Sequence, residues 1–169
     1  MKTIIETERL FLRDVEANDR SFIYELMNTP TWHQFIGDWN IHSLEVAENY
    51  IHSSIRKAYQ DFGFGMYKIL SKESGLPLGL CGLLQRDYLE SVDIGFAILP
   101  QFEGKGFTYE SARAIMDFGF ATLKKDVILG ITTEENIKSR KLLEKLGMQH
   151  IGRVKSSPNA EEIMLYSSK

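Results

Sequence analysis

The spacing of hydrophobic residues changes along the chain from the period of a strand to that of helices and back. Residues 9–13 alternate as a strand does, and two stretches of helical period follow. Asn18 or Asp19 precedes the first helix and Ser43 the second, as N-cap residues do. Their apolar faces consist of Phe22, Ile23, Leu26 and Met27, and of Leu44, Ala47, Ile51, Ile55 and Ala58. Residues 30–41, between the helices, are rich in aromatic side chains without a clear period, which predicts an irregular connection.

Strand patterns dominate the rest of the chain. Further strands are expected at residues 64–70, 78–84, 92–99, 127–131, 148–154 and 162–166. A long helix follows residue 106, with an apolar face of Ala112, Ile115, Met116, Gly119, Phe120 and Leu123. A shorter helix begins at a Thr133 cap and ends at Gly147. This order predicts one domain over residues 1–169 with an α/β fold, in which a mixed sheet carries helices on both faces.

Composition narrows the class of protein. Hydrophobic residues make up 43% of the 169 residues, enough for a core, and the net charge of −3 favours neither nucleic acid nor a membrane surface as a partner. Cys81 is the single cysteine, and the four histidines lack the spacing of metal ligands, so no disulfide and no metal site is expected. Without a signal-like or membrane-spanning apolar run, the sequence predicts a cytoplasmic protein.

The segment Gln101-Phe102-Glu103-Gly104-Lys105-Gly106 lies between an expected strand and the long helix. Two glycines at a helix start leave unpaired N–H groups at the positive end of the helix dipole, which predicts a site for an anion, most readily a phosphate. The segment is not a Walker loop, because that loop needs Lys-Ser or Lys-Thr directly after its second glycine, and here Phe107 follows Gly106. It is not a dinucleotide fingerprint either, because Tyr109 occupies the position of the third glycine.

The same segment matches the pattern Gln/Arg-x-x-Gly-x-Gly/Ala and resembles the pyrophosphate-binding motif of the GNAT superfamily of N-acetyltransferases. A second stretch, from Asn136 through Ser139 and Leu142 to Gly147, resembles the superfamily's next conserved helix. With the start Thr7-Glu8-Arg9-Leu10-Phe11-Leu12-Arg13, the chain is similar to the subgroup of ribosomal-protein N-terminal acetyltransferases (RimJ/RimL-like). The resemblance implies a mostly antiparallel sheet of about seven strands, splayed between strands four and five, and acetyl-coenzyme A as co-substrate.

The resemblance also implies roles for individual residues. The pyrophosphate would be held, mainly through backbone N–H groups, by Gly104, Lys105, Gly106, Phe107 and Thr108. Backbone N–H groups of Phe96 and Ile98, unpaired where the strands part, would bond the pantetheine amides or the thioester oxygen. Asn136 and Ser139 would face the coenzyme, and Ser139 would stabilise the sulfur as thiolate develops.

Transfer of an acetyl group to an amine requires a neutral amine, so a proton acceptor is expected. Asp93 is the candidate base, because it stands two residues before Gly95-Phe96, where many relatives carry Glu; Glu90 and water are the alternatives. Many relatives carry a tyrosine as general acid where Leu143 stands here, so that role would pass to Ser139 or to water, or would not be needed.

The acceptor would approach beside residues 30–41. Trp32, Asp38 and Trp39 suit an amine carried on an apolar or extended body, either a small molecule or a protein N-terminus. The expected activity is therefore an acetyl-coenzyme-A-dependent N-acetyltransferase. A non-catalytic acyl-coenzyme-A sensor is the alternative, because a sensor would keep the same phosphate loop. The sequence leaves the acceptor's identity open, and both a monomer and a homodimer are compatible with it.

Overall fold

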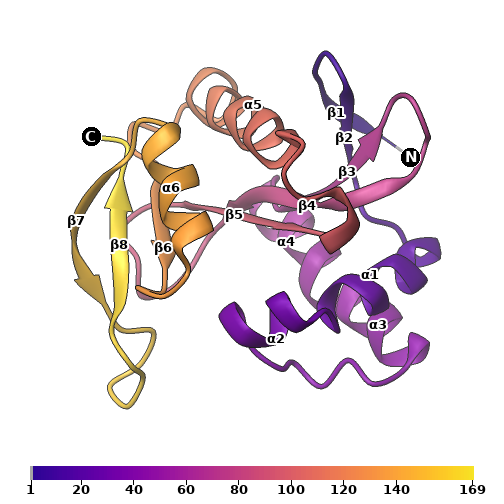
Figure 1. Ribbon diagram of the computed structural model, residues 1–169, viewed down its shortest axis with the longest axis horizontal. Coiled ribbons are helices and arrows are strands. Elements are labelled where there is room, and N and C mark those ends of the chain that lie inside the picture. The colour runs from indigo at the N-terminus through magenta and orange to yellow at the C-terminus, as the bar shows by residue number, and fades with distance from the viewer. Residues whose placement is uncertain (1) are drawn as a thin grey trace.

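A computed structural model describes residues 2–169 and contains one eight-stranded sheet, in the order β1-β2-β3-β4-β5-β6-β8-β7 (Figure 1). The strands are β1 (Thr3–Glu6), β2 (Leu10–Arg13), β3 (Met66–Ser71), β4 (Pro77–Leu84), β5 (Asp93–Ile98), β6 (Leu129–Thr132), β7 (Gln149–Val154) and β8 (Ile163–Ser167). Every neighbouring pair is antiparallel except β5 and β6, which are parallel. The expectation of a mixed, mostly antiparallel sheet is confirmed.

The α-helices are α1 (Arg20–Met27), α2 (Pro30–Phe35), α3 (Leu44–Tyr50), α4 (Lys57–Phe62), α5 (Phe107–Ala121) and α6 (Ile137–Lys145). Short helical segments are η1 (Ala17–Asp19), η3 (Pro100–Phe102) and the wider, π-helical turn η2 (Ile51–Arg56), which joins α3 to α4. None of the helices in residues 2–169 is long and apolar enough to cross a membrane.

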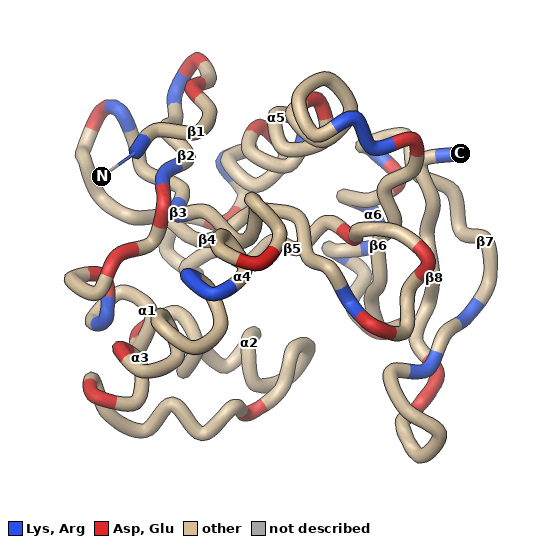
Figure 2. The backbone as a smooth tube through the Cα atoms, turned by 180° about the vertical axis from the view of Figure 1, so that it is seen from behind, with Lys and Arg blue, Asp and Glu red and all other residues tan. Residues whose placement is uncertain are grey.

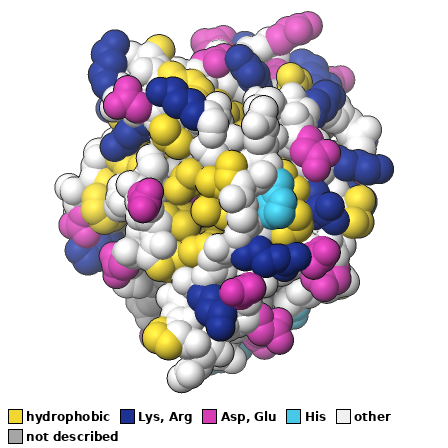
Figure 3. All heavy atoms as spheres, turned by 90° about the vertical axis from the view of Figure 1, so that its left-hand side faces the viewer, with side chains coloured by type: hydrophobic (Ala, Val, Ile, Leu, Met, Phe, Trp, Pro, Cys, Tyr) yellow, Lys and Arg dark blue, Asp and Glu magenta, His cyan; other side chains and the backbone are white. Residues whose placement is uncertain are grey.

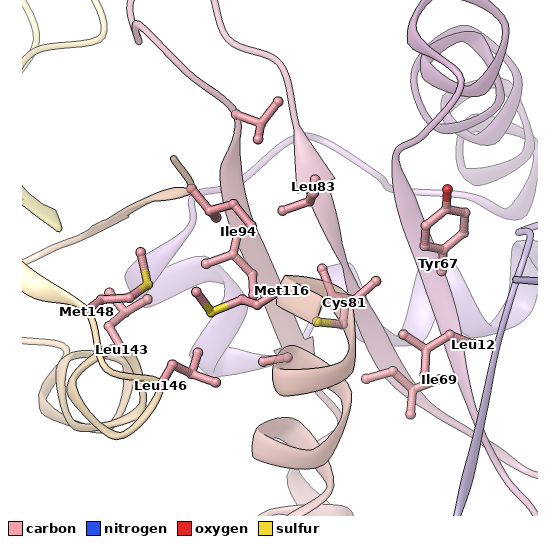
Figure 4. Packing of buried hydrophobic residues seen from close by; sticks show 14 of the residues in the cluster. Leu12, Tyr67, Ile69, Cys81, Leu83, Ile94, Met116, Leu143, Leu146 and Met148 are labelled. Atoms are coloured by element: carbon pink, nitrogen blue, oxygen red, sulfur yellow. The ribbon is translucent and has the colours of Figure 1, made fainter. Parts of the chain in front are cut away.

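Two hydrophobic clusters cover the two faces of the sheet. On one face, Cys81 and Leu83 of β4 pack with Ile94 of β5 and Met116 of α5, and Leu143 of α6 extends the cluster (Figure 4). On the other face, Leu80 of β4 belongs to the cluster formed with α1, α2, α3 and η2. Because both faces of β4 are covered, the strand is apolar along nearly its whole length rather than alternating with polar residues.

β5 and β6 separate soon after they meet. Their register contains one pair, Asp93 opposite Leu129, where the Leu129 N–H donates to the Val92 carbonyl at 2.8 Å. β6 then pairs along its length with β8 instead. The expected splay between the fourth and fifth strands is therefore present at this place. The sheet has eight strands rather than about seven because β1 pairs with β2; without β1, the fourth and fifth strands are β5 and β6.

The main departure from the predicted elements lies between the first two long helices. The structure has the two-turn helix α2 where an irregular connection was expected. Thr29 caps it by accepting a bond from the Trp32 N–H, and Pro30 occupies its first turn, where a missing N–H is harmless. The predicted Ser43 cap of α3 is confirmed, but Leu44 is 42% exposed rather than inward.

Lys and Arg positions and Asp and Glu positions are both spread along the backbone (Figure 2). The side of the molecule formed by β7 and β8 carries a group of hydrophobic side chains bordered by charged ones (Figure 3). β7 is an edge strand of the sheet, and its Ile151 is among the exposed large hydrophobic residues.

Candidate active site

The glycine loop after β5 has a backbone that favours glycine at two positions. Gly104 and Gly106 have φ angles of +74° and +81°, in the left-handed region that other residues seldom adopt. Gly106 is the N-cap of α5, and no side chain caps that end of the helix. The N–H groups of the first turn, which include those of Phe107 and Thr108, have no acceptor within the helix. A Cβ at Gly104 would meet no atom within 4 Å, so this side of the loop is open to an anion.

The backbone of β5 directs alternate residues into the splay. The Leu99 N–H donates to the Leu78 carbonyl at 2.8 Å, and the Ala97 carbonyl lies against Gly79, so odd-numbered residues bond to β4. The polar backbone groups of Phe96 and Ile98 consequently point toward the β6 side, where the register contains no partner beyond Asp93. These are donors of the kind that the predicted roles of Phe96 and Ile98 require.

α6 forms the wall opposite the glycine loop. Its N-cap is Asn136, whose Oδ1 accepts from the Ser139 N–H at 3.2 Å; Thr133, the predicted cap, does not cap it. Within residues 2–169, the Ser139 hydroxyl and the Asn136 Nδ2 have no hydrogen-bond partner and are therefore available to a ligand. Leu143 is buried in the core and has no polar side-chain atom, so it cannot act as a general acid.

Asp93 lies at the point where β5 and β6 part. Its side chain is 1% exposed, and its Oδ1 accepts a bond from the Arg86 Nε at 2.9 Å. Burial raises the pKa of the Asp93 carboxyl above its ordinary value, although Arg86 opposes the shift. Glu90 is exposed, on the segment that leads into β5. Asp93 thus has the raised pKa that suits a base, while Glu90 has the better access to solvent.

Three aromatic side chains, Trp32, Trp39 and Tyr50, contact one another at the expected acceptor region. Trp39 is 46% exposed and makes edge contacts with Trp32 and Tyr50, with ring centroids 6.3 Å and 5.6 Å away. Burial raises the pKa of Tyr50, and a hydrogen bond with Ser54 and the charge of Arg86 oppose this rise. Trp32 is only 7% exposed, so in this structure it supports Trp39 from the core and offers little surface to a ligand.

Asp38, which precedes Trp39 in the sequence, is exposed, and its Oδ1 accepts a hydrogen bond from the Asn40 N–H at 2.8 Å. A cavity of about 250 Å³ adjoins Tyr50 on the other side, between η2, α4 and the end of β4. Its lining includes the side chains of Ser54, Met66 and Gln85. Within residues 2–169, no group of three or more His, Cys, Asp or Glu side chains could hold a metal ion.

Sequence reasoning gave no role in this region to four charged residues, Arg86, Arg9, Glu110 and Lys138. Arg86 pairs with Asp93, and Arg9 bonds to Glu110 and to the carbonyl of Lys105. Lys138 of α6 pairs with Glu103 of the loop at 2.7 Å, across the splay. Arg9 carried a signal, because it belongs to the motif at residues 7–13, but neither period nor spacing indicated what it contacts.

Known proteins are similar to this chain along most of its length. A family model described as acetyltransferase (GNAT) domain matches residues 9–149. The uncharacterized N-acetyltransferase YoaA of Bacillus subtilis (strain 168) is 28% identical over 155 residues, which cover 90% of this chain and 86% of YoaA. Spermidine N(1)-acetyltransferase of Escherichia coli (strain K12) is 22% identical over 148 residues, covering 85% of this chain and 74% of the relative. The solved structure of RimL, a ribosomal L7/L12 alpha-N-protein acetyltransferase in complex with coenzyme A, is similar with a TM-score of 0.81 at 17% identity, covering 98% of this chain and 97% of RimL.

Proposed function

This chain belongs to the GNAT acetyltransferase family and is an N-acetyltransferase, and from that premise we propose that it transfers the acetyl group of acetyl-coenzyme A directly to a primary amine in a ternary complex. One observation carries the proposal: the open glycine loop, the β5 backbone and the N-terminus of α6 all border the gap between β5 and β6. An elongated ligand with phosphates at one end and a thioester at the other fits this arrangement.

The loop would hold the phosphate end of the coenzyme. The N–H groups of Gly104, Gly106, Phe107 and Thr108 supply donors, and exposed Lys105 supplies a positive charge. Phe96 and Ile98 would bond the pantetheine arm or the thioester oxygen through their N–H groups. Asn136 would bond the arm from α6.

In the reaction, the amine nitrogen attacks the thioester carbon, the carbon–sulfur bond breaks, and the sulfur leaves as thiolate. The nitrogen loses a proton, which Asp93, Glu90 or water accepts. A free alkyl amine with a pKa near ~10 is mostly protonated at neutral pH, so this proton transfer matters most there. Ser139 would donate its hydroxyl hydrogen bond to the departing sulfur.

The acceptor would reach the thioester past Trp39 and Asp38. Its class is a primary amine, either a small molecule or a protein N-terminus. The relatives named above include examples of both: a spermidine acetyltransferase and an acetyltransferase of a ribosomal-protein N-terminus. The exposed indole and the nearby carboxylate support an acceptor with a positive charge and an apolar or extended body.

The test is release of the coenzyme thiol after acetyl-coenzyme A is mixed with a panel of amines. The panel contains spermidine, peptides with a free N-terminus and the same peptides with a blocked one. We expect thiol release and an acetylated product, detected by mass spectrometry, with at least one class. Coenzyme binding without release for any amine would contradict transfer, and absence of coenzyme binding would overturn the whole proposal.

A further inference from the structure

Arg9, in the motif at residues 7–13, contacts the glycine loop and the first turn of α5 at the same time. Resting on the proposed function, we infer that Arg9 is a positioning residue for the coenzyme phosphates: it fixes the loop in the shape that binds them. The residues of its contacts are about a hundred positions away in sequence, so the connection emerges only in the fold.

Glu110, in the first turn of α5, receives three bonds from the turn between β1 and β2. The Thr7 hydroxyl donates to Oε1 at 2.6 Å, the Arg9 N–H donates to Oε1 at 2.9 Å, and the Arg9 Nε donates to Oε2 at 2.6 Å. Partial burial alone would raise the pKa of Glu110, but these bonds hold it below its ordinary value. The carboxylate therefore remains charged and anchors the start of the helix to the turn between β1 and β2.

The same guanidinium group reaches the middle of the loop. Its Nη1 donates to the Lys105 carbonyl at 3.0 Å, and its Cζ lies 4.5 Å from the centre of the Phe107 ring. Lys105 stands between the two glycines, the residues with the largest conformational freedom in the loop. A contact at Lys105 restrains the glycines on either side of it. The loop then loses less conformational entropy when phosphates bind, which favours binding.

The Arg9 charge is matched by Glu110, so its effect is expected to come from geometry more than from attraction of phosphates. Lysine would keep the charge at this position. A single ammonium group on a flexible chain, however, cannot hold the carboxylate and the Lys105 carbonyl in the fixed geometry of a planar guanidinium stacked on Phe107. Arg9→Lys therefore separates shape from charge.

The experiment measures the Kd of coenzyme A for four variants. Arg9→Ala should raise the Kd about tenfold, which corresponds to about 1.4 kcal/mol, and Arg9→Lys should raise it nearly as much. The control Arg13→Ala removes a neighbouring arginine of β2 that stacks on Phe11 away from the loop, and it should leave the Kd unchanged. The double variant Arg9→Ala/Glu110→Gln should stay weak. Recovery in this variant would instead mean that Arg9 merely neutralises Glu110.

A second readout excludes a general structural effect. With acetyl-pantetheine, which lacks the diphosphate and the nucleotide, Arg9→Ala should leave kcat/KM unchanged, because no phosphate contacts the loop. Two results would overturn the inference while leaving the proposed function intact. One is an equal loss of kcat/KM in Arg9→Ala with acetyl-coenzyme A and with acetyl-pantetheine, and the other is a wild-type Kd of coenzyme A in Arg9→Lys. Failure of the wild-type protein to bind coenzyme A would overturn both.

Discussion

Arg86 and Asp93 form an ion pair at the point where β5 and β6 separate, with the Arg86 Nε 2.9 Å from the Asp93 Oδ1. Asp93 is 1% exposed, whereas Arg86 is 31% exposed. Burial raises the pKa of the Asp93 carboxyl, and the ion pair with the partly exposed Arg86 opposes this rise without cancelling it. The pair therefore has two testable consequences, one for the reaction and one for stability.

The first prediction concerns proton transfer. Asp93→Asn should lower kcat about 100-fold at neutral pH, where the amine is mostly protonated, with little change in coenzyme affinity. Asparagine keeps an oxygen that can accept from Arg86, so the fold should persist. The deficit should shrink as pH rises toward the pKa of the amine, because the amine is then already neutral. A pH–rate profile checks this, and full activity at pH 7 would move the role to Glu90 or water.

The second prediction concerns stability. Arg86→Gln leaves Asp93 buried without its cation, so the pKa of Asp93 should rise further above its unfolded value. A raised folded-state pKa gives stability that is present below the unfolded pKa and is lost as pH rises through the folded pKa. The variant should therefore match the wild type near pH 4 and be less stable by about 2 kcal/mol at pH 7, allowing for the partial exposure of Arg86.

Urea unfolding at a series of pH values measures this difference. Arg113→Gln is the matched control, because Arg113 is 53% exposed and its pair with Asp117 lies on the surface of α5. It should change stability little at any pH. A constant loss in Arg86→Gln from pH 4 to pH 7 would show that Arg86 acts through packing and not through the charge of Asp93.

Most of the order of the elements, and the place where the site is expected, followed from local signals. Strand and helix periods located every strand of the sheet except β1. The glycines of residues 101–106 indicated a tight loop suited to an anion, because glycine readily adopts φ angles such as the +74° and +81° of Gly104 and Gly106. The splay came from the family resemblance alone, since pairing between β5 and β6 depends on how β6 is drawn toward β8.

Short elements and long-range contacts could not be predicted in the same way. α2 spans six residues, too few for a helical period to repeat, although Thr29 and Pro30 are helix-start signals. Thr133 and Asn136 are both residue types that cap helices. Because β6 continues to Thr132, α6 begins later than expected and Asn136 is its N-cap. The pairs of Arg9 with Glu110 and of Lys138 with Glu103 join separate elements, so only the packed fold brings them together.

The third prediction separates backbone strain from ligand binding at the glycine loop. Gly104 and Gly147 have φ angles of +74° and +87°, and a Cβ at either would meet no atom within 4 Å. Alanine at either position should therefore destabilise the protein by a similar amount, about 1 kcal/mol. Only Gly104→Ala should reduce the rise in Tm caused by coenzyme A, because its Cβ enters the space expected for the phosphates. Equal rises in both variants would remove Gly104 from the binding site.

The fourth prediction concerns the ion pair across the splay. Glu103 places a negative charge on the glycine loop, where the phosphates are expected, and Lys138 of α6, which is 86% exposed, pairs with it. Glu103→Gln should lower the Kd of coenzyme A about threefold at low salt, and Lys138→Ala should raise it, because each changes the charge that the phosphates meet. Both effects should fade above about 0.5 M salt, where screening is strong. Lys141→Ala, an exposed lysine of the same helix, is the control; if it matches Lys138→Ala, the pair has no specific role.

The last prediction concerns the acceptor. Trp39 exposes nearly half of its side chain while Trp32 and Tyr50 contact its ring, so it presents an indole surface to solvent in the region where the acceptor is expected. An ammonium or apolar group against this ring gains about 1 kcal/mol. Trp39→Ala should accordingly raise the KM for the amine several-fold and change the KM for acetyl-coenzyme A much less, since the phosphate loop lies elsewhere.

Asp38→Asn tests the charge of the neighbouring residue Asp38. Asparagine removes this charge but keeps a side-chain oxygen that can accept the hydrogen bond from the Asn40 N–H. It should raise the KM for a cationic amine and lose this effect at high salt. The control is Ile151→Ala, which removes an equally exposed hydrophobic side chain from β7 and should leave both KM values unchanged. Steady-state kinetics with each substrate varied in turn decide the matter. Unchanged amine kinetics in both variants, or a matching loss of coenzyme affinity, would place the acceptor elsewhere, with the cavity beside Tyr50 as the next region to test.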